Sequence, residues 1–282
     1  RLPDVFERSG SRMVEVGTTN RTRVTDFENA IRSSTGALLA AHWSNYTISG
    51  FVERVPLREL VELAERYGIP VIHDLGSGIL GDPAALGLSG EMSVNESVRS
   101  GAALSTFSGD KILGGPQAGI AVGRESVISR MRANPLARAL RPGKLTLAAL
   151  QATLHAYLEE DAESVPVIRM IKESPEALAG RAATLAARLS ERLGDAADVG
   201  SVELESRVGG GAAPERVIRS HGVEMRPLGA TKATELTARL LEQTPPVVAR
   251  TRDERVLFDL RTVAPEEEDD VLTAVEGALG LR

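Results

Sequence analysis

The sequence predicts an α/β fold that begins with a parallel sheet and continues into a smaller α+β domain. Short apolar runs alternate with amphipathic runs over the first 144 residues, which is the pattern of strands joined by helices that cover a sheet. Polar, glycine-rich sequence directly follows two of the apolar runs, those that end at Asp74 and Phe107. After residue 144 the pattern changes to two long helical stretches, and then to short strands separated by helices.

The first part of the chain is expected to hold several short strands with helices between them. The run Ala37–His42 is almost wholly apolar, as in a buried parallel strand. Apolar residues at helical spacing indicate a helix over Pro56–Tyr67, which Gly68 ends. Thr25 is the expected N-cap of an earlier helix, with Glu28 three residues later. That earlier helix is expected over 25–31, and a further helix over 125–132. The other expected strands are 13–16, 70–74, 102–107 and 118–122.

The second part is expected to begin with a long helix over residues 145–158 that connects two domains. A second long helix covers residues 174–193. A small α+β domain then follows, with strands at 201–205, 217–218, 247–250 and 255–259 and helices at 233–241 and 269–279. The predicted division is a large domain over 1–144, a connecting helix over 145–159 and a small C-terminal domain over 160–282.

Composition excludes several classes of protein. Hydrophobic residues make up 42% and charged residues 26% of the 282 residues, which is ordinary for a globular protein. No apolar run reaches the ~18 residues of a membrane span, and no signal peptide opens the chain, so we expect a cytoplasmic protein. The chain has no cysteine, and its four histidines lack metal-ligand spacing, which excludes disulfides and a zinc site. A net charge of −6 is unlike a protein that coats nucleic acid.

Two polar residues follow neighbouring strands in an order that suits one kind of chemistry. Asp74 ends an apolar strand, and Lys111 follows the next one in the sequence Ser108-Gly-Asp-Lys-Ile-Leu-Gly-Gly-Pro-Gln-Ala-Gly119. In this order an α/β fold of the aspartate-aminotransferase type holds pyridoxal phosphate (PLP). A lysine amine forms a Schiff base with the cofactor aldehyde, and a carboxylate keeps the ring nitrogen protonated. The alternatives are a surface lysine in a turn and an aspartate that caps a turn or helix.

The lysine loop also resembles that of the bacterial selenocysteine synthases, the L-seryl-tRNA(Sec) selenium transferase family. Further segments resemble this family in the same order, namely Val14–Thr22, Ser44–Tyr46, Asp74–Gly78, Pro135–Arg141 and Val208–Gly211, so the resemblance covers essentially the whole chain. It implies the large domain of a fold-type-I PLP-dependent transferase, incomplete at its N-terminus, with a small α+β C-terminal domain. It also implies the conversion of L-seryl-tRNA(Sec) to L-selenocysteinyl-tRNA(Sec) with selenophosphate, through a dehydroalanyl intermediate.

Other residues at strand ends are expected to bind the cofactor. A hydroxyl at Ser108 often reaches the cofactor phosphate in this fold, with Thr106 and Ser105 as alternates. Ser77 and Asn45 follow other strand ends, and Asn45 suits either the ring hydroxyl or a turn.

The turn that contains Gly114, Gly115 and Gln117 offers backbone N–H groups to an anion, or is a plain tight turn. In related folds such a loop serves the phosphate of the neighbouring subunit, which predicts a homo-oligomer with active sites between subunits. His42 and His73 flank the same edge of the sheet and are expected to be satisfied core histidines rather than residues that stack on the ring.

A pair of arginines is the expected binding site for the second substrate. Arg138 and Arg141 are spaced to share one face of a helical turn, and two guanidinium groups bind a tetrahedral anion well. The resemblance implies that they hold selenophosphate and that Asp110, beside Lys111, takes part in catalysis. The alternatives are two solvated arginines and a loop acid that neutralises a nearby cation.

Two other functions stay open at this point. One is a PLP-dependent lyase that acts on a phosphorylated sugar-acid amine, whose phosphate would use the same arginines. The other is an inactive, cofactor-free fragment with an oligomerisation role, which the lack of a phosphate-binding helix start before Arg1 supports. Asp110 in Ser-Gly-Asp-Lys favours the selenium enzyme.

Overall fold

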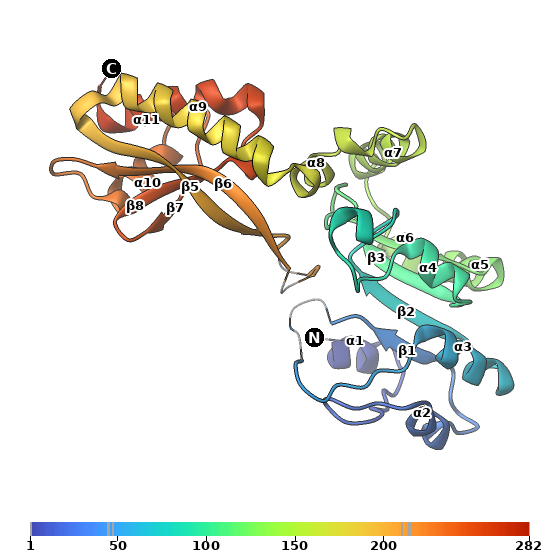
Figure 1. Cartoon of the computed structure of the whole chain (residues 1–282). Helices are drawn as coiled ribbons and strands as arrows, with labels where there is room; N and C mark the ends of the chain where they lie inside the picture. The colour runs from blue at the N-terminus through green and yellow to red at the C-terminus, as the bar shows by residue number, and fades with distance from the viewer. Residues whose placement is uncertain (1, 44–45, 47, 210, 214–215, 282) are drawn as a thin grey trace. The chain divides into compact units, whose positions relative to one another are not determined.

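The structure is a computed structural model that describes residues 2–43, 46, 48–209, 211–213 and 216–281. By its internal contacts the chain divides into two compact units (Figure 1). The N-terminal unit contains residues 1–161 and 209–215, and the C-terminal unit contains residues 162–208 and 216–282. The predicted domain limits, 1–144, 145–159 and 160–282, stay a prediction.

The N-terminal unit is built on a four-stranded sheet of order β1-β2-β3-β4. Its strands are β1 (Leu38–Ala41), β2 (Val71–Gly76), β3 (Leu104–Ser108) and β4 (Gly119–Gly123), close to four of the five strands expected from the sequence. β1, β2 and β3 are parallel, whereas β4 runs antiparallel to β3. Only a short loop joins β3 to β4, and a parallel pair needs a crossover of about a dozen residues or more.

Two local predictions for this unit were wrong. Residues 13–16 form no strand, because no strand among the described residues lies beside them, and Met13 and Val14 are exposed. Thr25 is not an N-cap, because it is already the second residue of helix α2 (Val24–Ala30), whose N-cap is Arg23. There the carboxylate of Asp26 accepts a hydrogen bond from the backbone N–H of Arg23 at 2.8 Å.

Helices pack against the sheet through apolar faces. Helix α3 (Leu57–Arg66) buries Leu60 and Leu63 in a cluster that also holds Leu38 of β1 and Val71 of β2. Helix α4 (Val94–Arg99) begins with a capping box. The other helices of this unit are α1 (Leu2–Arg8), α5 (Glu125–Ala133), α6 (Pro135–Ala139), α7 (Lys144–Leu158) and the short 3₁₀-helix η1 (Ala84–Leu86).

The C-terminal unit has an antiparallel sheet of order β5-β6-β8-β7, with strands β5 (Ala197–Arg207), β6 (Val217–Pro227), β7 (Arg250–Arg252) and β8 (Arg255–Asp259). Helices α9 (Pro175–Leu193) and α11 (Glu268–Leu279) run along the sheet (Figure 1). They share a core with α10 (Ala233–Leu241) in which Leu189, Val223, Phe258 and Leu272 are fully buried. The remaining helices are α8 (Pro166–Lys172), η2 (Ala162–Ser164), η3 (Gly194–Ala196), η4 (Leu260–Thr262) and η5 (Pro265–Glu267).

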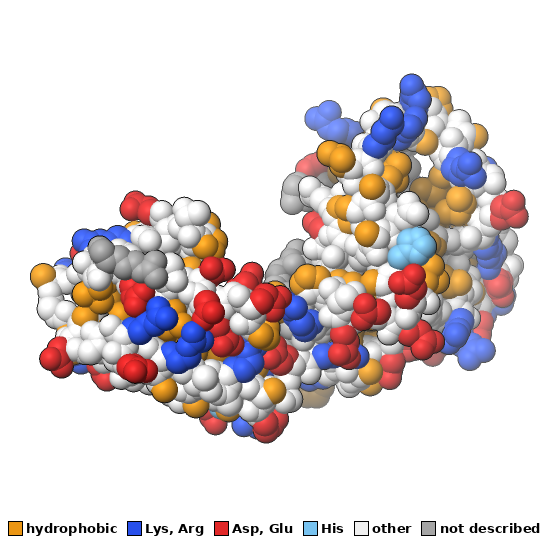
Figure 2. Space-filling model, turned by 90° about the horizontal axis from the view of Figure 1, so that it is seen from above, with side chains coloured by type: hydrophobic (Ala, Val, Ile, Leu, Met, Phe, Trp, Pro, Cys, Tyr) orange, Lys and Arg blue, Asp and Glu red, His pale blue; other side chains and the backbone are white. Residues whose placement is uncertain are grey.

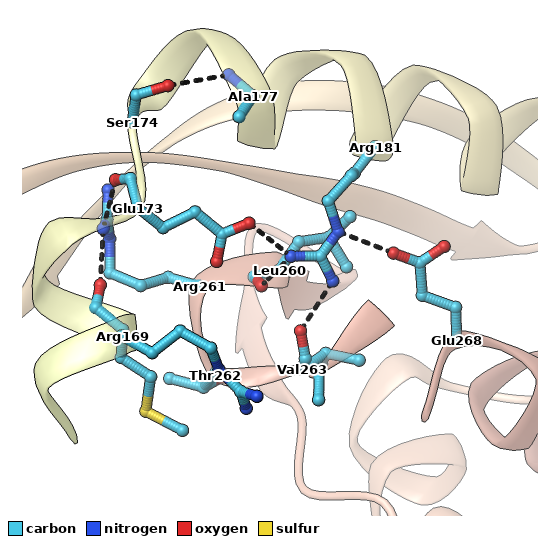
Figure 3. Close-up of polar contacts among 12 residues, drawn as sticks. Arg169, Glu173, Ser174, Ala177, Arg181, Leu260, Arg261, Thr262, Val263 and Glu268 are labelled. Carbon is cyan, nitrogen blue, oxygen red and sulfur yellow. Dashed lines mark hydrogen bonds and ion pairs between the residues drawn. The ribbon is translucent and has the colours of Figure 1, made fainter. Parts of the chain in front are cut away.

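Ion pairs around Arg181 tie the helices of this unit together (Figure 3). The Arg181 guanidinium on α9 donates to Glu173 Oε1 at 2.6 Å and to Glu268 Oε1 at 2.8 Å. It also donates to the backbone carbonyl of Val263 at 2.7 Å. Burial alone lowers the pKa of Arg181, but the hydrogen bonds to Glu268 and Glu173 outweigh it, and the pKa is raised.

Among the described residues, no helix combines the length and the apolar character that a membrane crossing requires.

Candidate active site

The first part of the candidate site is a carboxylate held at the carboxyl end of the parallel strands. Asp74 on β2 pairs in register with Ala41 of β1 and Thr106 of β3. The Thr106 hydroxyl donates to Asp74 Oδ1 at 2.9 Å, and no hydrogen bond from the described residues engages Oδ2. One oxygen of Asp74 is therefore fixed and the other is available to a ligand.

The second part is the loop that carries Lys111 between β3 and β4. The loop closes on itself, because Gly115 donates to the Gly109 carbonyl at 2.8 Å and Gly109 donates to the Ala118 carbonyl at 2.8 Å. Ile112 and Leu113, the two residues after Lys111, are almost fully buried. The Tyr157 hydroxyl of α7 donates to the Leu113 carbonyl at 3.0 Å, and burial raises the pKa of Tyr157 to about 12. The backbone around Lys111 is thus held on both sides.

The turn after β2 packs directly against the lysine loop. The Ile112 N–H donates to the Ser77 carbonyl at 3.1 Å. A Cβ atom at Gly78 would lie only 2.9 Å from the Ser108 carbonyl oxygen, so this close approach, together with a φ of +76°, requires glycine. The structure therefore brings Ser77, Ser108 and Lys111 together at the edge of the sheet where Asp74 lies.

Ser77 is the clearest sign that this edge receives a ligand. Its side chain is 1% exposed, and its Oγ has no hydrogen-bond partner among the described residues. Buried hydroxyls in proteins are nearly always hydrogen-bonded, so an unpaired one needs an explanation. A polar ligand atom at this edge of the sheet would supply the missing partner.

Two of the predicted anion donors in the glycine-rich turn are already used. The Gly114 N–H donates to the Lys111 carbonyl at 2.9 Å, and the Gly115 N–H donates within the loop. Both bonds arise because the turn must close tightly to return the chain into β4. Of the three residues expected to bind phosphate there, only Gln117 keeps a backbone N–H that no described residue accepts, and Gln117 is exposed.

The two histidines of this edge differ in their surroundings. His73 is buried, and its Nδ1 lies 2.7 Å from Ser97 Oγ, which lies 2.7 Å from Ser105 Oγ. Burial, followed by the nearby His42, lowers the pKa of His73 to about 4, so it is a neutral core histidine, as predicted. His42 Nε2 lies 3.1 Å from a carboxylate oxygen of Glu91. Because the Ser105 hydroxyl already takes part in this series of hydrogen bonds, Ser105 is a poor alternative to Ser108 as a ligand for the cofactor phosphate.

The arginine pair does not share a helical face as expected. Helix α6 ends at Ala139, so it contains Arg138 but not Arg141. Arg141 precedes Pro142, and a residue before proline is disfavoured in the helical conformation. Both arginines are exposed, as is Asp110, and no hydrogen bond or ion pair within the described part of the chain joins either arginine to the lysine loop.

Asn45 lies outside the described residues, so its expected role at the cofactor ring stays a prediction. Sequence reasoning considered Thr106 only as an alternate phosphate ligand and missed its bond to Asp74. The signal was available, since both residues end neighbouring strands of one parallel sheet. Within the described part of the chain, no cluster of three or more His, Asp or Glu side chains suits a metal ion.

Comparisons with known proteins bear directly on this site. A model of the L-seryl-tRNA selenium transferase family matches residues 1–264. Proteins named L-seryl-tRNA(Sec) selenium transferase from Nitratidesulfovibrio vulgaris and Solidesulfovibrio magneticus are each 51% identical to this chain and align with 100% and 99% of it. The aligned region is 60% of either relative, so the chain spans about 60% of the length of these curated relatives.

A solved structure of D-glucosaminate-6-phosphate ammonia-lyase resembles the chain with a TM-score of 0.60 at 20% identity, over 99% of this chain and 67% of that one. At this identity the likeness concerns the fold alone, and it confirms the predicted fold-type-I class. The resemblance read from the lysine loop is confirmed as well. Since the family model and both relatives match nearly the whole sequence, this chain belongs to the L-seryl-tRNA selenium transferase family.

Proposed function

We propose that this chain forms the cofactor-binding core and C-terminal domain of an enzyme that converts L-seryl-tRNA(Sec) to L-selenocysteinyl-tRNA(Sec), with selenophosphate as the selenium donor and PLP as cofactor. Membership of the family supports this reaction. The observation that carries it is the placement of Asp74, fixed by Thr106, beside the loop that presents Lys111.

The residues at this edge fit PLP by their chemistry. The uncommitted Oδ2 of Asp74 suits the protonated ring nitrogen, and the orphaned Ser77 Oγ suits a polar group of the cofactor. Ser108, at the end of β3, is a further hydroxyl for the phosphate. When bound, PLP would supply an aldehyde for the Lys111 amine and a cationic ring that withdraws electrons from the substrate carbon.

Three residues would then act on the substrate. Asp74 would hold the proton on the ring nitrogen, and the Thr106 hydroxyl keeps the Asp74 carboxylate oriented. With the cofactor bound, the Lys111 amine would take the proton from the seryl Cα and return a proton later in the reaction. Asp110 is adjacent to Lys111 in the sequence and is exposed, and we assign to its carboxyl group the role of assisting the departure of the seryl hydroxyl.

Selenophosphate is a tetrahedral anion, which matches the guanidinium groups of Arg138 and Arg141. Because both side chains are exposed, they are free to turn toward an anion. They belong to a basic stretch, since residues 124–144 contain six Arg or Lys residues and one Glu. On the face drawn in Figure 2, acidic and basic side chains are interspersed.

A basic stretch of this kind gives a chain of net charge −6 a local surface for tRNA phosphates. Use of an aminoacyl-tRNA agrees with a cytoplasmic location. A homo-oligomer with active sites between subunits is supported by the exposed apolar side chains of α6, its C-cap residue and α7, which are Leu136, Leu140, Leu145, Leu147, Leu154 and Leu158.

The test uses the complete gene product with PLP, L-seryl-tRNA(Sec) and radioactive selenophosphate. We expect selenium to enter the tRNA, and we expect Lys111→Ala and Asp74→Asn to abolish this incorporation while remaining folded. Lys232→Ala is the matched control, because Lys232 is exposed directly before α10, outside the basic stretch. Incorporation by Lys111→Ala at the wild-type rate would contradict the proposal.

A further inference from the structure

A glycine from a distant part of the sequence lies against the side chain of Lys111. Gly209 and residues 211–213 lie between β5 and β6 in the sequence, yet by their contacts they belong to the N-terminal unit rather than to the unit of those strands. Gly211, Ala212 and Ala213 are buried there. This segment is therefore packed into the unit that carries the lysine loop.

The contact leaves no room for a side chain at position 211. A Cβ atom at Gly211 would lie 2.8 Å from Cε, 2.9 Å from Nζ and 3.5 Å from Cδ of Lys111. Nonbonded carbon atoms prefer separations of about 3.5–4.0 Å. Any residue other than glycine would thus force the end of the Lys111 side chain to move.

Little else in the described residues holds the end of this side chain. No hydrogen bond or ion pair among them engages Lys111 Nζ, and the carboxylate of Asp110 forms no ion pair with it. A lysine amine sits on a flexible four-carbon stem. The backbone at Gly211 is consequently a steric limit on where this amine can lie.

We infer that Gly211 is a positioning residue for Lys111: the missing side chain at 211 determines where the lysine amine is held. The inference rests on the proposed function, which assigns the PLP aldehyde to that amine. It differs from a purely conformational role, in which glycine is present at 211 only because its φ is +90°.

Gly209 provides the control that separates these two roles. Its φ is +106°, so alanine is strained there too, but a Cβ atom at Gly209 would meet nothing within 4 Å. Gly209→Ala therefore tests backbone strain without the lysine contact, and Gly211→Ala tests both.

The first experiment needs no cofactor and is a double-mutant cycle on the complete gene product. The urea midpoint of unfolding is measured for Gly211→Ala and Gly209→Ala, each in the wild-type and in the Lys111→Ala background. We expect Gly211→Ala to lower the midpoint less when Lys111 is shortened, because the clashing atoms are gone. Gly209→Ala should lower it equally in both backgrounds. Equal shifts for Gly211→Ala would overturn the inference.

If Gly211→Ala alone does not fold, its rescue by Lys111→Ala supports the contact, and the absence of rescue contradicts it.

The second experiment titrates PLP and follows its visible absorbance. We expect Gly211→Ala to raise the apparent Kd for PLP about two- to tenfold, the factor that corresponds to forcing one side chain off its rotamer. Gly209→Ala should leave the Kd unchanged, and equal losses in both variants would contradict the inference. If the cycle shows coupling but PLP is found on another lysine, the proposed function fails while the contact of Gly211 with Lys111 stands.

Discussion

The ion pairs of Arg181 predict a large loss of stability when this one side chain is shortened. Arg181→Met removes the guanidinium but keeps most of the apolar stem. It leaves two carboxylates, those of Glu173 and Glu268, without their cation in surroundings where their side chains are only 19% and 14% exposed. It also leaves the Val263 carbonyl without its donor. Figure 3 shows these groups converging on one guanidinium.

The expected cost follows from the burial of these groups. Breaking a buried ion pair on one side costs about 3–5 kcal/mol, and Arg181 itself is 17% exposed, so we expect about 3 kcal/mol. The matched control is Arg188→Met on the same helix, because Arg188 pairs with Asp269, whose side chain is 79% exposed. An exposed pair of that kind contributes at most about 1 kcal/mol.

The assay is urea unfolding of the complete gene product, with hydrogen exchange of α9 and α11 peptides to locate the effect. Arg181→Met should accelerate exchange in both helices, and the added substitutions Glu173→Gln and Glu268→Gln should recover much of the loss. If Arg181→Met and Arg188→Met cost the same, or if the two glutamines give no recovery, the reasoning is refuted.

Three further predictions concern the N-terminal unit. Thr106→Val should lower selenium incorporation about tenfold or more, because a hydrogen bond to a charged group contributes about 1.5–3 kcal/mol, whereas Thr106→Ser should restore it; equal losses in both would contradict the role of the hydroxyl. Because the folded chain keeps His73 neutral down to about pH 4 while the unfolded chain takes up a proton below about 6.5, acidification through this window should favour unfolding. His73→Gln should remove up to about 3 kcal/mol of that pH dependence in urea titrations, and an unchanged slope would oppose this. Arg138→Ala and Arg141→Ala should each raise the selenophosphate concentration required for half-maximal incorporation about tenfold to a hundredfold, and lysine at either position should rescue poorly. If the dependence on selenophosphate is unchanged, both arginines are merely solvated surface residues, and if tRNA binding is lost instead, they bind the nucleic acid.

The fold could be predicted from the sequence where a segment's own residues determine whether it forms a strand or a helix. The strand at Leu38–Ala41 and the helix at Leu57–Arg66 follow from apolar runs and from helical spacing, and both were confirmed. The missing strand at 13–16 depends on whether a neighbouring strand is available, and the direction of β4 follows from the short loop after β3; the apolar pattern reports neither. The lengths of β5 and β6 were underestimated, since the sequence predicted strands only at 201–205 and 217–218. Exposed polar residues along both strands interrupt the apolar pattern on which that prediction depended.

The candidate site was predictable in its reactive residues but not in its supports. Asp74 and Lys111 stand out because each follows an apolar strand with an unusual polar residue. The bond from Thr106 to Asp74 needs the register of two strands, and the approach of Gly211 to Lys111 joins residues a hundred positions apart. The N–H groups of Gly114 and Gly115 seemed available in the sequence, yet the closure of the loop uses them.

The most direct test of the account is to identify the lysine that binds PLP. The chain contains four lysines, Lys111, Lys144, Lys172 and Lys232, so peptide mapping gives an unambiguous answer for this part of the protein. The complete gene product is loaded with PLP, reduced with borohydride, digested and analysed by mass spectrometry. The account predicts a pyridoxyl group on Lys111 and its loss in Lys111→Ala. A pyridoxyl group on any other lysine, with Lys111 unmodified, would contradict it.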